Sequence, residues 1–182
     1  MRSIDHNKAK ALLIVGAFIL LGACATPKGE GFAIYLTKEE IPPAKMEALS
    51  HVDIADQAII STGDIITYDA QTHELTLTDA AFERISQLEV PVSGRSFVVC
   101  VDKGPVYWGA FWTPISSQSF NGITIWKPLG SPERKSITLD LGYPSPSFYG
   151  GEDPRNNAAV MKSLERADKL SNTGAGSTTA PS

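Results

Sequence analysis

Hydrophobic residues alternate with polar ones in several short segments, and this period of two is the spacing of half-buried β-strands. Leu75 and Leu77, for example, alternate with threonines. Residues 62–69 are ambiguous, because they fit either a helical turn or a strand. The pattern predicts that strands dominate, at residues 31–37, 58–61, 75–78, 96–102, 106–113, 123–126 and 136–141, the last of these being the final strand.

Three segments have the spacing or the flanking residues of helices. The clearest follows Thr78, whose hydroxyl can accept amide hydrogens of the first turn, while Asp79 is favourably placed on the helix dipole. Behind this cap the apolar residues share one face at helical spacing: Ala81, Phe82, Ile85 and Leu88. A short helix over residues 44–49, after two prolines, and a closing helix over 158–170 are also expected.

The strongest strand signal is SFVVCVD, residues 96–102. Because both of its faces are apolar, this strand is expected at the centre of a sheet. A turn at 103–105 returns the chain as a neighbouring strand over 106–113. These elements predict an α+β fold with a mostly antiparallel sheet and about three helices packed mainly on one face.

The returning strand is rich in aromatic residues. Trp108 and Trp112 share one of its faces. Tyr107 and Phe111 share the other. Helices on one side of the sheet cover only one of these sets, so the other is a candidate exposed binding patch. The alternative is that the loop over residues 142–157, with three further aromatic residues, folds back over it. The candidate binding residues are Tyr107, Trp108, Phe111, Trp112 and Trp126.

The N-terminal segment has the pattern of a secretory signal. Three basic residues lie among the first ten, and residues 11–23 then contain no charged side chain. This apolar run is shorter than the roughly 20 residues of a membrane-spanning helix. It ends at residues 21–24 (LGAC), which resemble the lipobox of bacterial lipoproteins. The resemblance implies cleavage before Cys24 and lipidation of its thiol, whereas the alternative is an ordinary secretory signal with a coincidental cysteine.

This resemblance divides the chain and gives its location. It implies a signal peptide over 1–23, a lipidated cysteine with a short linker over 24–30, one globular domain over 31–170 and a disordered polar tail over 171–182. The lipid anchor on Cys24 would tether the domain in the cell envelope, facing the periplasm or the cell exterior. In a host with two membranes, Ala25 in place of an aspartate after the cysteine implies the outer membrane.

Composition limits the partners further. The net charge is −4, and it becomes about −6 without residues 1–23. No basic run is present, so neither nucleic acid nor anionic lipid is an expected partner. If Cys24 carries lipid, Cys100 is the remaining cysteine, in an apolar strand where a buried inert thiol is the simplest expectation. A reactive thiol or an intermolecular disulfide is the alternative, and no cofactor is expected.

Residues 58–127 are similar to a second known pattern. It is carried by LTLT at 75–78, by the helix that follows, by GRSFVV at 94–99, and by Gly122-Ile123. This order resembles the head subdomain in the first large periplasmic domain of the SecD translocation protein. The resemblance implies a non-enzymatic module that contacts polypeptides or envelope proteins, and it carries no catalytic residue across. Pro105 and the crowded aromatic residues depart from the pattern.

Candidate catalytic and metal-binding residues are few. His73-Glu74 lacks the second histidine of a zinc metalloprotease helix. Asp69, His73 and Glu74 could form a metal or acid/base cluster, although a solvated turn explains them more simply, as it does the His51-Val52-Asp53 segment. The loop over 150–157 brings oxygen donors near one another, but it lacks the glycine and the final glutamate of an EF-hand, so no metal site is predicted.

Two functional hypotheses follow. The first is a membrane-anchored lipoprotein whose non-catalytic domain binds a protein or peptide partner in the envelope. The second is a metal-binding or hydrolytic envelope enzyme that uses the His73 region or the 150–157 loop. The second hypothesis requires those side chains to converge on one cleft.

Overall fold

The computed structural model describes residues 29–130 and 133–171. The predicted signal peptide, Cys24 and the polar tail beyond Ser171 lie outside the described residues. Ser171 itself, expected as the first residue of the tail, belongs to a strand. No helix in the described part of the chain is long and apolar enough to span a membrane.

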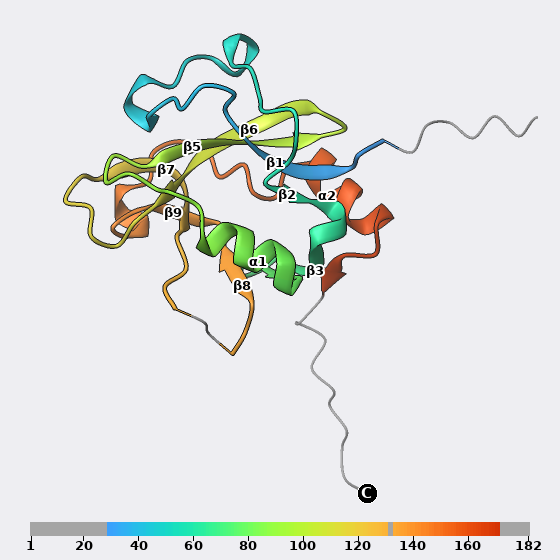
Figure 1. The fold of residues 1–182 in the computed structure, drawn as a ribbon. Helices are drawn as coiled ribbons and strands as arrows, with labels where there is room; N and C mark the ends of the chain where they lie inside the picture. The colour runs from blue at the N-terminus through green and yellow to red at the C-terminus, as the bar shows by residue number, and fades with distance from the viewer. Residues whose placement is uncertain (1–28, 131–132, 172–182) are drawn as a thin grey trace, which may run out of the picture.

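Strands dominate the fold and form two sheets among the described residues (Figure 1). The larger sheet has the order β2-β1-β5-β6-β7-β9, and the smaller has the order β10-β3-β4-β8. Strand β5 lies inside the larger sheet, as its two apolar faces predict. The strands are β1 (Phe32–Leu36), β2 (Ile60–Ser61), β3 (Ile65–Asp69), β4 (Glu74–Leu77), β5 (Arg95–Val101), β6 (Gly104–Trp112), β7 (Phe120–Trp126), β8 (Ser136–Thr138), β9 (Asp140–Tyr143) and β10 (Leu170–Ser171).

The α+β class is confirmed, but the expectation of three helices is wrong. The described residues contain two α-helices, α1 (Asp79–Ser86) and α2 (Ala158–Arg166). Thr78 caps α1 as predicted, since its Oγ1 accepts a hydrogen bond from the Ala81 amide at 3.3 Å. The four short 3₁₀ helices are η1 (Pro43–Lys45), η2 (Leu49–His51), η3 (Thr62–Asp64) and η4 (Pro146–Phe148).

The helix expected over 44–49 is replaced by η1 and η2, with an extended break at Met46. Residues 44–49 would form fewer than two helical turns, and so few backbone hydrogen bonds do not offset the free-energy cost of nucleating a helix. Residues 62–69 instead combine both of their predicted conformations, because η3 leads directly into β3.

Both sheets are mixed, which corrects the expectation of a mostly antiparallel sheet. Strand β6 pairs in parallel with β7, and β3 pairs in parallel with β10. The segment 136–141, expected as one final strand, is divided at Leu139 between β8 in the smaller sheet and β9 in the larger one. Alternation within a segment predicts which of its residues share a face. It does not predict which strand pairs with the segment, because the two strands can lie far apart in the sequence.

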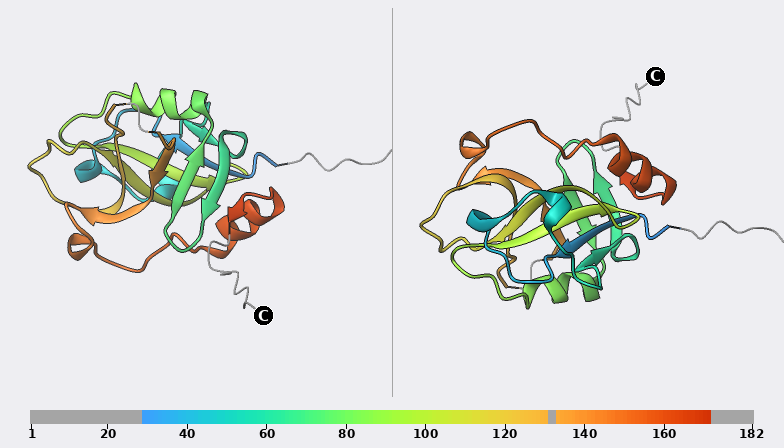
Figure 2. Two further views of the ribbon diagram at one scale, coloured as in Figure 1. Left: turned by 90° about the horizontal axis from the view of Figure 1, so that it is seen from below. Right: turned by 90° about the horizontal axis from the view of Figure 1, so that it is seen from above.

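The main core lies between the two sheets. It combines Phe97, Val99 and Phe111 of the larger sheet with Leu75 and Leu77 of the smaller one. Helix α1 contributes Ala81, Phe82 and Ile85 to this core, and α2 contributes Val160 and Leu164. Figure 2 shows the strands of the smaller sheet between α1 and α2.

The opposite face of the larger sheet is covered without an α-helix. The irregular segment over residues 38–58 (cyan in Figure 1) crosses this face. Its Val52 packs with Tyr35, Val98 and Cys100 of the sheet. Further along the same face, aromatic side chains of β6, β7 and β9 form a third cluster, which includes Trp112.

Candidate functional site

Strand β6 carries aromatic side chains on both faces, as its alternation predicts. Tyr107 and Phe111 pack into the main core. Trp112 packs on the opposite face with Phe120 and Tyr143. Trp108 borders the same cluster. The sequence therefore assigns the faces of this strand correctly.

Three of the five candidate binding residues are buried, so neither face of β6 is an exposed aromatic patch. Tyr107, Phe111 and Trp112 are only 6%, 0% and 2% exposed. Trp108 and Trp126 retain partial exposure. Of the three loop aromatic residues that the alternative named, Tyr143 does pack on Trp112, whereas Phe148 is exposed and Tyr149 packs on the main core.

The crossover between β6 and β7, residues 113–119, explains the burial. Because β6 and β7 are parallel, the chain must return to the start of β6 before β7 begins, and it returns on the face that carries Trp108 and Trp112. The Tyr143 hydroxyl holds this crossover by donating a 2.9 Å hydrogen bond to the Ser116 carbonyl. The ring of Phe120 then lies on that of Trp112, with centroids 5.2 Å apart and planes 7° apart.

Between this crossover and the η1 turn lies a cleft of about 460 Å³, which we call the aromatic groove. Trp108, Trp112 and Phe120 supply its rings. Trp108 is tilted by 50° against Phe120, with the two centroids 5.7 Å apart. The other lining residues are Pro43, Ala44, Ser93, Gln118, Ser119 and Asn121.

None of the residues that line the aromatic groove carries a charged side chain. Its rim offers hydroxyl and carboxamide groups, which both donate and accept hydrogen bonds. The indole Nε1 of Trp112 is buried and has no hydrogen-bond partner among the described residues. An unpaired buried donor lowers the stability of a protein by about 1–3 kcal/mol, so a carbonyl that accepted a hydrogen bond from this nitrogen would remove that loss of stability.

His73 is buried, which corrects its interpretation as part of a solvated turn. It is 4% exposed, and its backbone has a φ of 57°. Its Nδ1 lies 2.8 Å from the hydroxyl of Tyr68, which is fully buried. Burial lowers the pKa of His73, and the nearby positive charge of Arg155 lowers it further. The neutral imidazole is therefore the favoured form in this site.

The 150–157 loop approaches His73 through Arg155 and Asp153. The guanidinium of Arg155 pairs with the Asp153 carboxylate at 2.7 Å and donates a second 2.7 Å bond to the Leu139 carbonyl. This hydrogen bonding lowers the pKa of Asp153. Glu152 and Asn156, the other oxygen donors of the loop, are exposed.

These polar residues do not make a metal centre. No group of three or more His, Cys, Asp or Glu side chains within residues 29–130 and 133–171 is arranged to hold a metal ion. The side chain of Asp69 closes its own turn by accepting bonds from the Gln71 and Thr72 amides. Glu74 pairs with Arg134 at 3.2 Å. His51 and Asp53 are exposed on the segment that follows η1.

Cys100 is fully buried and is not part of a disulfide. Burial raises the pKa of its thiol to about 11. Cys100 therefore occupies the environment of a small apolar side chain. Cys24 lies outside the described residues.

Sequence reasoning missed Phe120, which shares the aromatic groove with the two tryptophans. The local signal was an aromatic residue directly before the Asn121-Gly122 pair. Its place in the site depends on the parallel pairing of β6 and β7, and alternation along the chain does not specify that pairing.

No known protein family, curated protein or solved structure matches this chain. The resemblances to bacterial lipoproteins and to the SecD head subdomain therefore remain predictions.

Proposed function

We propose that the protein is a lipid-anchored lipoprotein of the cell envelope whose non-catalytic domain binds an uncharged, extended peptide segment of a partner protein. The aromatic groove is the observation that carries this proposal. The lipobox-like residues 21–24 support the anchor, which would hold the domain at the membrane surface.

The lining of the aromatic groove favours an extended peptide. Flat rings bind apolar side chains and proline rings, and extended segments commonly dock in aromatic-lined grooves. The rim residues Gln118, Ser119 and Asn121 can satisfy the main-chain N–H and C=O groups of such a segment. Since the lining contains no charged side chain, an uncharged segment fits better than an acidic or basic one.

Site-specific photo-crosslinking in cells tests this proposal. A photoreactive amino acid at Gln118, on the rim, should capture a partner of defined mass, and sequencing of the crosslinked peptide should return an uncharged segment. Trp108→Ala should abolish this product. Trp126→Ala is the matched control, because Trp126 packs against Tyr143 in the same cluster but does not line the groove. Equal loss in both variants, or no product at Gln118, would contradict the proposal.

The stability of the tryptophan variants must be compared as well. Thermal unfolding of Trp108→Ala, together with the conservative Trp108→Phe, separates a lost contact from a lost fold. We expect Trp108→Phe to retain crosslinking, because it keeps an aromatic ring at the groove.

The anchor is tested by metabolic labelling with a palmitate analogue. Cys24→Ser should remove the label and release the protein from membranes, whereas Cys100→Ser should leave both unchanged. Persistence of the label on Cys24→Ser would contradict lipidation at this position. In a host with two membranes, Ala25→Asp should move the protein from the outer to the inner membrane.

The alternative function, a metal-binding or hydrolytic enzyme, would use the Tyr68–His73 pair and the Arg155–Asp153 pair. Their approach is the observation that favours it. Because His73 is 4% exposed, its ring is closed to a substrate in this conformation. The aromatic groove is open, so we place the proposed function there.

A further inference from the structure

The floor of the aromatic groove excludes one common mode of peptide binding. Strand β6 pairs with β5 and β7, and β7 pairs with β6 and β9, so neither is an edge strand. A peptide that adds a strand to a sheet needs a free edge for its main-chain hydrogen bonds. A segment on this floor therefore binds through side-chain contacts, which is how polyproline II segments bind in aromatic-lined grooves.

The absence of charge is local to the aromatic groove. The irregular segment over residues 38–58 also borders another cleft, of about 510 Å³, whose lining carries three acidic side chains and a lysine. The aromatic groove takes Pro43 and Ala44 from the same segment, and its lining has no charged side chain. A charged ligand group would lose hydration in the groove without gaining an ion pair. Charge complementarity therefore favours an uncharged occupant.

Trp108 is the tryptophan that an occupant meets. Trp112 and Phe120 are only 2% and 8% exposed, and their rings stack on one another. Trp108 lines the groove and is partly exposed, and its indole nitrogen forms no hydrogen bond with any residue in the described ranges. An indole N–H donates but does not accept, whereas the hydroxyl and carboxamide groups of the rim do both. The groove therefore holds a donor for which the protein supplies no acceptor.

Two features fix the walls of the groove. The Ser116 hydroxyl joins the crossover to the loop before β5 by donating a hydrogen bond to the Val92 carbonyl. Gly94 leaves room for the Trp112 ring beside η1, since an added Cβ would lie 2.3 Å from that ring and 3.1 Å from Pro43 Cγ. A groove that is formed before binding favours a rigid ligand, because neither partner then loses much conformational entropy.

We infer that the aromatic groove binds a proline-rich segment in the polyproline II conformation. A proline-rich main chain offers carbonyl acceptors with few N–H donors, which suits the unpaired donor of Trp108. Its rings are apolar and uncharged, and they fix φ, so the segment is extended before it binds. The inference rests on the proposed function and names the class of peptide. The proposed function itself requires only an uncharged, extended segment.

Isothermal titration of the full chain in detergent tests this inference. The ligand is a decaproline that is blocked at both ends, so that it carries no charge. It should bind at least about tenfold more tightly than a blocked decapeptide of alternating threonine and alanine, which is uncharged but is not held in polyproline II. The mirror-image decamer of D-proline has the same composition and the opposite helix hand. It should also bind at least about tenfold more weakly than decaproline.

The outcomes separate this inference from the proposed function. If the threonine–alanine peptide or the D-proline peptide binds as tightly as decaproline, the preference for polyproline II is overturned. No binding of decaproline overturns the inference as well. The photo-crosslink at Gln118 then decides about the proposed function, which stands if an uncharged segment is still captured and fails if no product forms.

The variant Trp108→Phe separates the indole donor from the aromatic ring. It keeps a ring but removes the N–H, so decaproline binding should weaken about fivefold, the effect of one lost hydrogen bond. Trp126→Phe is the matched control, because it removes an indole from the same aromatic cluster but outside the lining of the groove. This control should change decaproline binding less than about twofold. Equal effects of the two variants overturn the role of Trp108 as the donor.

Two other occupants give different results. A second copy of the chain in the groove would produce a concentration-dependent dimer in detergent that Trp108→Ala removes, which sedimentation detects. A glycan would also stack on an exposed tryptophan ring, so a neutral hexamer of N-acetylglucosamine is added as a competitor. We expect a monomer, and we expect no competition by the sugar at the concentration of decaproline. Either the dimer or displacement of decaproline by the sugar overturns the inference.

Discussion

At the scale of single residues, His73 couples the stability of the fold to pH. Burial and the charge of Arg155 lower its pKa below 6.5, whereas Asp153 and Asp69 act in the opposite direction. The unfolded chain therefore takes up a proton first as the pH falls. The free energy of unfolding should decrease as the pH drops below about 6.5, before most carboxylates titrate near 4.

The variant His73→Asn should flatten this pH dependence between about pH 5 and 7, since asparagine tolerates the positive φ but does not titrate. Its overall stability should be lower, because the bond to Tyr68 is weakened or lost. Urea unfolding at several pH values measures the slope. His51→Asn, at an exposed position, should keep the slope of the wild type, and identical slopes in both variants would contradict this assignment.

Cys100 should be chemically inert while the protein is folded. It is fully buried, and its pKa of about 11 leaves almost no thiolate at pH 8. An aromatic disulfide reagent should therefore modify Cys100 only after urea unfolds the chain. Ser50→Cys, at an exposed position, is the control that should react at once. Rapid reaction of Cys100 in native protein would show that the strand around it opens.

At the scale of elements, the parallel pairing of β6 and β7 depends on Gly109. A Cβ at this position would lie 2.4 Å from the Ile123 carbonyl oxygen and 2.5 Å from the Phe97 ring. Gly109→Ala should lower the free energy of unfolding by about 1–3 kcal/mol, the usual effect of overpacking. At Gly150 a Cβ would meet only the Asn121 amide nitrogen, at 3.7 Å, so Gly150→Ala should change stability little. Equal urea midpoints for the two variants would refute the steric argument.

The sequence predicts single elements better than their arrangement, because alternation and capping are local. The Thr78 cap of α1, the central strand β5 and the two faces of β6 are all readable from neighbouring residues. The division of residues 136–141 between two sheets cannot be read in this way, because their alternation of apolar and polar residues is compatible with either sheet.

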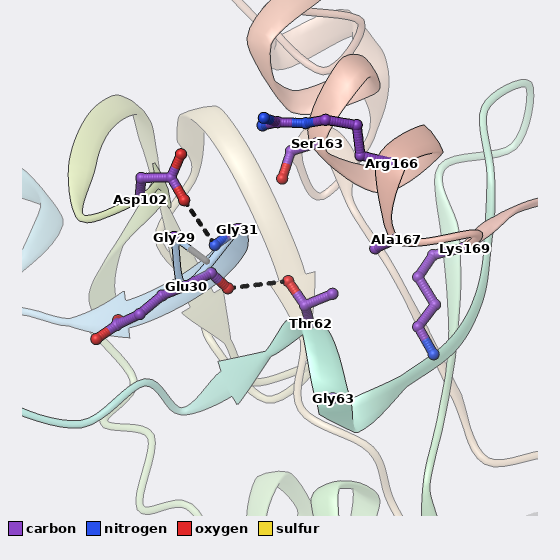
Figure 3. A pocket seen from close by; sticks show the side chains of 10 residues that line it. All are labelled: Gly29, Glu30, Gly31, Thr62, Gly63, Asp102, Ser163, Arg166, Ala167 and Lys169. Carbon is purple, nitrogen blue, oxygen red and sulfur yellow. Dashed lines mark hydrogen bonds between the residues drawn. The ribbon is translucent and has the colours of Figure 1, made fainter. Parts of the chain in front are cut away.

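The candidate sites show the same contrast between local and non-local features of the sequence. The alternation of their own strand predicts that Trp108 and Trp112 share a face, whereas Phe120 joins them through a non-local strand pairing. A second cleft, between residues 29–31, η3, Asp102 and the end of α2 (Figure 3), gathers residues from four separate segments, and no spacing in the sequence links Gly31 to Ser163. Sequence patterns therefore indicate the residues of the first site and give no signal for those of the second.

At the scale of the whole molecule, one core joins the two sheets, and both should unfold together. The main core includes residues of both sheets and of both helices, so neither sheet can separate without exposing it. All three tryptophans lie on β6 and β7 of the larger sheet, whereas Tyr68 lies on β3 of the smaller one. Tryptophan fluorescence therefore reports on one sheet, and far-ultraviolet circular dichroism reports on both.

We expect the two probes to give coincident urea transitions. Leu164→Ala provides the stronger test, because this residue of α2 is fully buried in the main core. The substitution should destabilise the fold by about 2–5 kcal/mol. It should shift both transitions equally, although Leu164 lies on neither of the strands that carry the tryptophans. If circular dichroism shifted while tryptophan fluorescence did not, the larger sheet would be a separate folding unit.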